Sequence, residues 1–292
     1  MNATVETGTP GQHLLPALNA AVRALGASAG GASASRLLGL LYDPDVDIDR
    51  ILQCLRSEPV LAARVLKVAN APYYGRSGQV GSVERAVQLL GLQAIRGIAA
   101  AGALDRMTPP KTGHIFDPVR FRRHSAAVAA AAQGLSRKAG CGIDGEAFIA
   151  GLMHDIGVLL LVKADPSAMA AFEPPDGADQ GAASEAERAQ LGLDHEAAGV
   201  LIVESWALPA WLKAAVAAHH DTAMRCGGGL DALPCLLRLA DRLAASAGYG
   251  LWPRCEGPVE AAWLDELGLG ADDVQALLES LPEAVDALTT GA

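Results

Sequence analysis

Apolar residues recur three and four positions apart along most of the chain, which is the spacing of one buried face of an α-helix. The clearest stripe follows Asp117-Pro118, a helix cap and a first-turn proline, and ends at Gly140. It contains Phe121 and Leu135, and His124 falls on the same stripe. The pattern therefore predicts a long helix that carries a histidine on its buried face.

The same periodicity predicts helices in every part of the chain. The expected ranges are residues 14–25, 36–42, 51–56, 59–70, 83–90, 93–104, 145–153, 184–191, 195–206, 210–218 and 236–247, followed by two short acidic helices within 259–288. Alanine and leucine dominate the composition, aromatic residues make up only 4%, and runs of β-branched residues are scarce. We therefore expect an all-α fold.

The best candidate linker is the Pro/Gly-containing segment 107–113. It divides the chain into a disordered N-terminus (1–11), an N-terminal helical subdomain (12–108), a second helical subdomain (109–250) and a C-terminal helical tail (251–292).

Charge and composition argue against several classes of partner. The net charge is −10 and no Lys/Arg-rich tract is present, so nucleic-acid binding is not expected. Residues 1–10 lack the pattern of a signal peptide, and apolar runs such as 126–132 and 157–162 are too short to span a membrane. The five cysteines are scattered and form no C-x-x-C pair. We expect reduced thiols in a cytoplasmic protein.

Residues 151–157, Gly-Leu-Met-His-Asp-Ile-Gly, place a histidine and an aspartate side by side inside an apolar segment. An unpaired carboxylate is costly to bury, and a buried imidazole also needs partners. Imidazole nitrogen and carboxylate oxygen together form a common ligand set for divalent metals. His154 and Asp155 are therefore candidate metal ligands. The alternative is a capped helix end whose His and Asp bond to nearby backbone.

Five of the seven histidines lie at predicted helix positions in the second half of the chain. With two aspartates they give the candidate ligands His124, His154, Asp155, His195, His219, His220 and Asp241. A site with several imidazoles and bridging carboxylates suits iron, manganese or zinc. Two such ions about 3.5–4 Å apart bind a phosphate group and activate water.

Single members of this set also have structural explanations. His124 fits a hydrogen-bonded core histidine, and His219 and His220 end a helix, where a protonated imidazole is favoured. Asp241 follows Arg238 by one helical turn, which equally suits an exposed ion pair. The ordered set of His, His-Asp, His, His-His and Asp is more specific than any of its members.

In this order the seven residues resemble the metal ligands of the HD superfamily of helical metal-dependent phosphohydrolases. The first half narrows the resemblance, because residues 57–71 (SEPVLAARVLKVANA) and 82–91 (SVERAVQLLG) look like the hallmark segments of HDOD proteins. Residues 151–157 and Trp206-Ala207-Leu208-Pro209 agree with them, and the resemblance covers residues 14–250.

The resemblance implies an all-α protein in which an N-terminal helical bundle packs on an HD-like helical bundle. HDOD proteins are bacterial, are usually linked to signal transduction, and are generally viewed as non-catalytic relatives of the HD phosphodiesterases. The resemblance therefore favours a regulatory module that acts through contacts with a signalling protein partner.

Two features keep other hypotheses open. No Gly-Tyr-Pro motif follows His219-His220, so hydrolysis of cyclic di-GMP is poorly supported, yet every position that matches an HD metal ligand holds a capable residue. The alternative is thus a metal-dependent phosphohydrolase acting on a nucleotide or cyclic nucleotide. One metal would be held by His124, His154, Asp155 and Asp241, and a second by His195, His219 and His220. A third hypothesis retains a metal that only stabilises the fold or senses iron or redox state. The sequence assigns no catalytic residue and no cofactor other than a divalent metal.

Overall fold

The computed structural model describes residues 14–27, 46–57, 59–70, 80–175, 180–221, 226–252, 259 and 261–289. Every regular element in these ranges is helical, and an isolated β-bridge joins Thr112 and Phe116. The all-α fold is therefore confirmed. The N-terminus predicted to be disordered (1–11) and the helix predicted over 36–42 lie outside the described residues.

Most helices follow the ranges expected from the sequence, but the helices over 156–164 and 166–171 were not expected, and the two helices expected over 83–90 and 93–104 form one kinked helix. The helices are α1 (Leu14–Ala27), α3 (Ile48–Ser57), α4 (Pro59–Ala69), α5 (Val83–Met107), α6 (Pro118–Ala139), α7 (Asp144–Met153), α8 (Ile156–Ala164), α9 (Pro166–Ala171), α10 (Gln180–Leu191), α11 (His195–Ser205), α12 (Ala210–Ala218), the 3-10 turn η2 (Gly229–Ala232), α13 (Leu233–Ala244), the π-helical turn η3 (Ala245–Tyr249), α14 (Ala261–Glu266) and α15 (Ala271–Thr289).

Local sequence signals explain where the long helices begin and end. Asp117 caps α6 by accepting hydrogen bonds from the backbone N–H groups of Val119 and Arg120, and Gly140 ends the helix in the left-handed conformation. Gly91 takes a φ of 76° inside α5, which bends where the sequence predicts one helix to stop and the next to begin.

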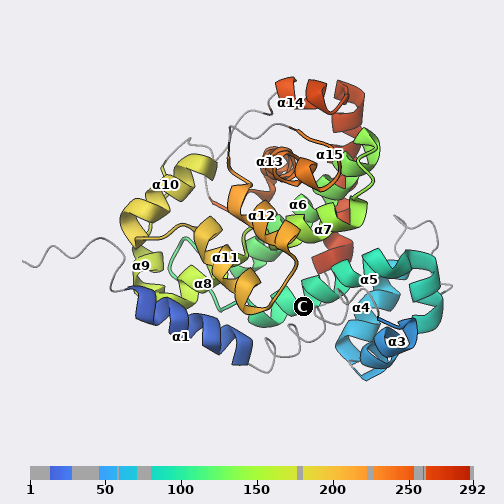
Figure 1. Cartoon of the computed structure of the whole chain (residues 1–292), viewed down its shortest axis with the longest axis horizontal. Coiled ribbons are helices and arrows are strands. Elements are labelled where there is room, and N and C mark those ends of the chain that lie inside the picture. The colour runs from blue at the N-terminus through green and yellow to red at the C-terminus, as the bar shows by residue number, and fades with distance from the viewer. Residues whose placement is uncertain are drawn as a thin grey trace, which may run out of the picture.

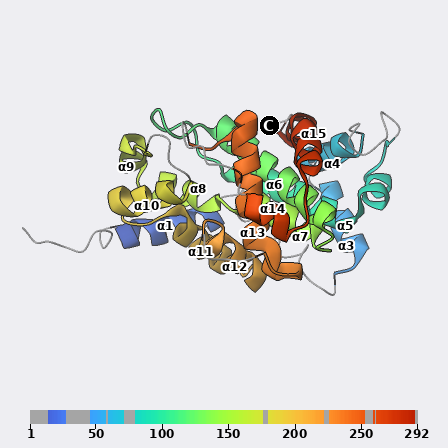
Figure 2. The ribbon, with the colours of Figure 1, turned by 90° about the horizontal axis from the view of Figure 1, so that it is seen from above.

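Two apolar cores divide the helices. The smaller core lies among α3, α4 and α5 and includes Ile51 and Ile95. The larger core is formed by α1, the end of α5 and the helices from α6 onward, and Leu18 of α1 is buried in it. Figures 1 and 2 place α3 and α4 at one end of the molecule and α1, α9 and α10 at the other. The packing of one helical bundle on another is confirmed, while the sequence-based domain boundaries remain a prediction.

Helices α7 and α8 form the centre of the larger bundle. Every residue from 147 to 162 is buried, and each fully buried leucine in α8 contributes about 1.5–3 kcal/mol. Residues Asp144–Ala164 are, among those described, long and apolar enough to cross a membrane, but 89% of their apolar window is buried inside the protein. This helical stretch is longer than the apolar runs 126–132 and 157–162, which are too short to span a membrane. A core helix passes the same test, and here the helical path is interrupted at His154-Asp155.

The tail folds back over α6. Helices α14 and α15 are separated at Gly268, as the sequence predicts, and α15 buries Leu281 and Val285 against the larger core. The ion pair between Arg123 and Asp286 (3.1 Å) lies at this contact. Such an exposed pair contributes only about 0–1 kcal/mol, so apolar burial is the main force that holds α15 in place.

One expectation about the cysteines is wrong. The structure joins Cys226 and Cys235 in a disulfide, with Cα atoms 5.3 Å apart, whereas Cys141 is a free thiol. The η2 turn folds the chain back between the two positions, and this places their Cα atoms within the usual disulfide range. Linear spacing alone gave no sign of this approach.

Candidate metal centre

Five segments of the larger bundle bring the seven candidate ligands together. They supply His124 from the middle of α6, His154 and Asp155 from the turn between α7 and α8, His195 from the first position of α11, His219 and His220 from the end of α12, and Asp241 from α13. All are buried except His220, which is half-buried. The structure thus unites residues that are up to 117 positions apart in the sequence.

The carboxylate of Asp155 lies between two groups of imidazoles. Its Oδ2 atom is 3.1 Å from Nε2 of His124 and 3.2 Å from Nε2 of His154. Its Oδ1 atom is 3.3 Å from Nε2 of His195 and 3.5 Å from Nε2 of His219. Each oxygen of this one carboxylate therefore faces a separate set of ring nitrogens.

We call these sets the His124 half (His124, His154 and Asp155) and the His195 half (Asp155, His195, His219 and His220). Within each half, the atoms that could bind a metal all lie within 4.8 Å of one another. Because Asp155 belongs to both halves, its carboxylate could supply a ligand atom to a cation in either half.

The outer nitrogens of four imidazoles are fixed by hydrogen-bond acceptors. Nδ1 of His124, His154 and His219 donates to the backbone carbonyls of Tyr249 (2.8 Å), Gly151 (2.7 Å) and Val216 (2.7 Å), respectively. Nδ1 of His195 donates to Oε2 of Glu187 (2.6 Å). A proton on Nδ1 leaves the Nε2 atom of a neutral ring as a lone pair that points into the site.

The inward lone pairs face one another at short range. Nε2 of His124 lies 3.2 Å from Nε2 of His154, and Nε2 of His195 lies 3.2 Å from Nε2 of His219. Two lone pairs at this distance repel each other unless a cation or proton lies among them. The donor set therefore fits a metal ion in each half, and imidazole with carboxylate suits iron, manganese or zinc.

The comparisons with known proteins agree with this fold. A sequence model of the HDOD domain matches residues 31–222. The chain belongs to the HDOD domain family. Among solved structures, a provisionally named phosphohydrolase from Shewanella amazonensis SB2B is 27% identical with a TM-score of 0.70, and the match covers 94% of this chain and 98% of that one.

Two further structures show the same fold at lower identity. An HDOD domain protein of unknown function from Geobacter sulfurreducens is 22% identical, with a TM-score of 0.67 and coverage of 89% of this chain and 92% of that one. A provisionally named signal transduction protein from Marinobacter aquaeolei VT8 is 24% identical, with a TM-score of 0.68 and coverage of 94% and 64%. The search among curated proteins found no match.

One residue of this HDOD protein's site was missed in the sequence. Glu187 on α10 is fully buried, and its Oε2 atom accepts hydrogen bonds from both the backbone N–H (2.7 Å) and Nδ1 of His195. From the sequence, this segment is expected only to form a helix over 184–191. A signal was present, because Ala183, Glu187 and Leu191 form a buried stripe at four-residue steps, the same kind of signal that singled out His124.

Asp241 is part of the centre and not part of an exposed ion pair. It is 2% exposed, and its Oδ1 atom lies 3.6 Å from Nε2 of His124 without a hydrogen-bond partner among the described residues. Arg238 instead donates to the carbonyl of His220 and lies over the ring of Trp263. The exposed-pair alternative is wrong because α13 is buried on all sides. A buried carboxylate oxygen without a protein partner is a suitable ligand for a cation.

Two glycines of the segment 151–157 allow the ligand-bearing helices to approach one another closely. A Cβ atom at Gly151 would lie 2.7 Å from the Cα of Ala129 on α6, and a Cβ at Gly157 would meet the backbone of His195. Any larger residue would therefore push α7 away from α6, or α8 away from α11. The Gly-to-Gly segment thus sets the spacing of three ligand-bearing elements around the site.

The buried charges change one another's protonation. Burial alone would raise the pKa of Asp155, but the imidazoles of His154 and His195 outweigh this and hold it well below its usual range. Burial would likewise lower the pKa of His195, yet the carboxylates of Glu187 and Asp155 raise it to about 10. Burial lowers the pKa of His220 well below its usual value. A metal that binds to His195 must therefore displace a proton.

Proposed function

We propose that this HDOD protein is a metal-dependent phosphohydrolase that serves bacterial signal transduction. The observation that supports it best is the Asp155 carboxylate, which faces His124 on one side and His195 on the other within a complete set of donors. The Shewanella relative at 27% identity carries a phosphohydrolase name, which agrees with the proposal.

The residues of the chain prepare the site for this chemistry. The donors of the two halves would hold divalent ions, and such ions would supply the Lewis acidity that phosphoester hydrolysis requires. The acceptors at Nδ1 hold each ring in one tautomer and one orientation, so little reorganisation is needed when a ligand binds. Burial of the imidazoles lowers the local dielectric and strengthens every charge interaction at the centre.

This proposal reverses the order of preference drawn from the sequence. The sequence favours a non-catalytic module because HDOD proteins are generally viewed that way. The donor geometry favours catalysis, because a site kept only as a structural relic has no need of four fixed imidazole tautomers around a shared carboxylate.

A regulatory module that acts through a signalling protein partner is the second candidate. The observation in its favour is the small bundle of α3, α4 and the first part of α5, which has its own apolar core and contributes none of the seven candidate ligands. In both proposals the protein is cytoplasmic, and neither nucleic acid nor membrane is a partner.

Metal content and phosphate release test the first proposal together. Protein is expressed with added iron, manganese and zinc, and metals are counted by mass spectrometry for wild type, Asp155→Asn and His114→Gln. His114 is an exposed histidine outside the site and serves as the control. We expect about two metal equivalents in wild type and control, and a loss of both in Asp155→Asn. Phosphate release from a panel of phosphomonoesters and phosphodiesters, nucleotides included, should fall with the metal.

Each outcome has a clear meaning. Metal-free wild-type protein, or hydrolysis that survives Asp155→Asn, contradicts the proposal. Bound metal without hydrolysis of any ester on the panel favours the regulatory candidate. Circular dichroism of Asp155→Asn shows whether lost metal reflects a lost fold.

A further inference from the structure

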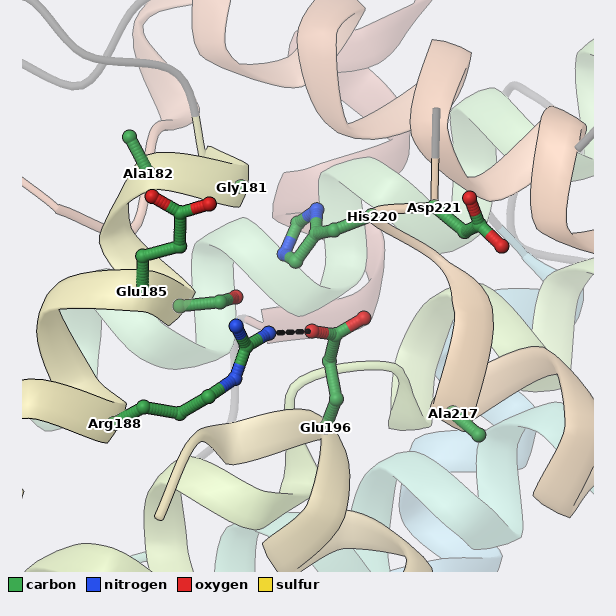
Figure 3. A pocket seen from close by; sticks show the side chains of 9 residues that line it. Gly181, Ala182, Glu185, Arg188, Glu196, Ala217, His220 and Asp221 are labelled. Carbon is green, nitrogen blue, oxygen red and sulfur yellow. Dashed lines mark ion pairs between the residues drawn. The ribbon is translucent and has the colours of Figure 1, made fainter. Parts of the chain in front are cut away.

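A cavity of about 490 Å³ adjoins one half of the metal centre and not the other. Its walls come from α10, from α11 and from the end of α12, and they include Ser184, Glu185, Arg188, Glu196, His220 and Asp221. His220 is the only one of the seven candidate ligands in this wall. Figure 3 shows its ring beside the side chains of Arg188 and Glu196. A molecule in the cavity would therefore lie against the His195 half.

The wall of this cavity carries an excess of negative charge. Three carboxylates, those of Glu185, Glu196 and Asp221, accompany one guanidinium, that of Arg188. Arg188 is itself neutralised, because it bonds to Asp194 and lies 3.6 Å from Oε2 of Glu196. Figure 3 marks this second pair inside the cavity. The wall alone therefore attracts cations and N–H donors, whereas a nucleoside polyphosphate would be repelled.

The neighbouring metal centre has the opposite preference. Divalent ions held by the His195 half would attract a phosphoryl group at the His220 side of the cavity. A ligand that satisfies both environments must carry a phosphoryl group at one end and a positive charge at the other. The volume of the cavity lies toward the small end of the range for small-molecule sites.

We propose that this cavity binds a small phosphomonoester of an amino alcohol, with its ammonium group held by Glu185 and Glu196. The inference deepens the proposed function and rests on it for the metal at the phosphoryl end. Hydrolysis of such an ester adds water to phosphorus and breaks the bond between phosphorus and the alcohol oxygen. The products are inorganic phosphate and the amino alcohol, whose oxygen takes a proton from water. The nucleotide ligand considered from the sequence fits this charge pattern less well.

Binding of two matched probes tests the inference without turnover. 2-Aminoethylphosphonate and propylphosphonate have the same number of heavy atoms and a carbon–phosphorus bond that the proposed reaction does not cleave, and they differ by the ammonium group. Titration calorimetry on zinc-loaded wild type should show at least tenfold tighter binding of the amino compound. In Glu185→Gln and in Glu196→Gln, this preference should fall to about threefold or less. The change should be larger for Glu196→Gln, because it also releases Arg188 from a pairing carboxylate.

The control is Glu204→Gln, a variant on the same helix as Glu196. Glu204 pairs with Lys213 on the surface and does not line the cavity, so its variant should keep the wild-type preference. Equal binding of both probes to wild type, no binding of either, or a preference that survives Glu185→Gln and Glu196→Gln together would overturn the inference. Circular dichroism checks the fold of each variant, and either single variant suffices if the other is unfolded.

The two proposals fail in different ways. Hydrolysis of phosphoesters with no advantage for the ammonium-bearing probe would sink only the cavity assignment. A strong preference for that probe in a protein that hydrolyses nothing would sink the phosphohydrolase proposal and keep the cavity as a ligand-binding site.

Discussion

The two halves of the metal centre share one carboxylate but are held by different kinds of group. In the His124 half, both outer nitrogens donate to backbone carbonyls, those of Tyr249 and Gly151. In the His195 half, His219 likewise donates to the carbonyl of Val216, but His195 donates to the carboxylate of Glu187, and His220 borders the cavity. A carbonyl only orients a ring, whereas a carboxylate also adds negative charge that binds protons and metals more tightly. The first half is therefore set by the backbone alone, whereas the second borders a cavity and is set in part by a side chain.

Removal of one imidazole from each half gives the largest expected effect. We predict that His124→Gln loses the ion of the His124 half and keeps the other, while His219→Gln does the reverse. The reason is that the half without the substitution keeps all of its imidazoles and the Asp155 carboxylate. Metal content by mass spectrometry should fall from about two equivalents to about one in either variant. Loss of both ions from a single variant, with the fold intact, would show that the halves are one cooperative site.

Replacement of Glu187 should weaken only the His195 half. Glu187→Gln keeps the size of the side chain but removes the charge that supports His195, and loss of such a partner typically costs about 10–100-fold in metal affinity. Competition with a chelating dye measures the metal affinity of this half. Glu204→Gln is the control, because this substitution removes an exposed carboxylate from the neighbouring helix. Equal weakening of both ions would contradict the division into halves.

The pH dependence of metal binding sharpens this prediction. His195 has a pKa of about 10 because of Glu187 and Asp155, against the desolvation that lowers it. Below that pH a proton competes with the metal, so wild-type affinity in the His195 half should rise about tenfold for each unit of increasing pH. Without the charge of Glu187 the pKa falls and the slope flattens. The difference between variant and wild type is therefore largest at high pH, and dye competition at pH 7.0 and 8.5 tests it.

The two-metal hypothesis drawn from the sequence groups the candidate ligands much as the structure does, except that it gives Asp155 to one metal only. Six of the seven candidates stood out because a histidine or the His-Asp pair lay at predicted helix positions among apolar residues. Asp241 could not be separated from a surface ion pair, because burial of α13 on all sides depends on helices that are distant in the sequence.

The missing parts depend on three-dimensional contacts. Glu187 lies in a segment rich in charged residues, where a single buried carboxylate is hidden unless the four-residue stripe with Ala183 and Leu191 is counted. The sharing of Asp155 follows from the orientation of its two oxygens, which no spacing encodes. The fold itself was predicted well because helical periodicity and caps are local properties.

The smallest expected effect concerns the backbone that holds His124. Tyr249, whose carbonyl accepts from His124, follows Gly248, which has a φ of 84° in the η3 turn. A Cβ atom at Gly248 has open space, so Gly248→Ala should cost about 1–2 kcal/mol of unfolding free energy through backbone strain alone. If the turn relaxes, the carbonyl shifts and affinity in the His124 half falls by less than about tenfold.

Gly268→Ala provides the matched control for this substitution. Gly268 has a φ of 66°, also has open space for a Cβ atom, and lies between α14 and α15, away from the ligands. Both variants should unfold at similarly lower denaturant concentration, but only Gly248→Ala should weaken metal binding, and only in the His124 half. If the two variants bind metal equally well, the position of the Tyr249 carbonyl does not affect metal affinity. The claim that the fold itself sets this half would then rest on Gly151 alone.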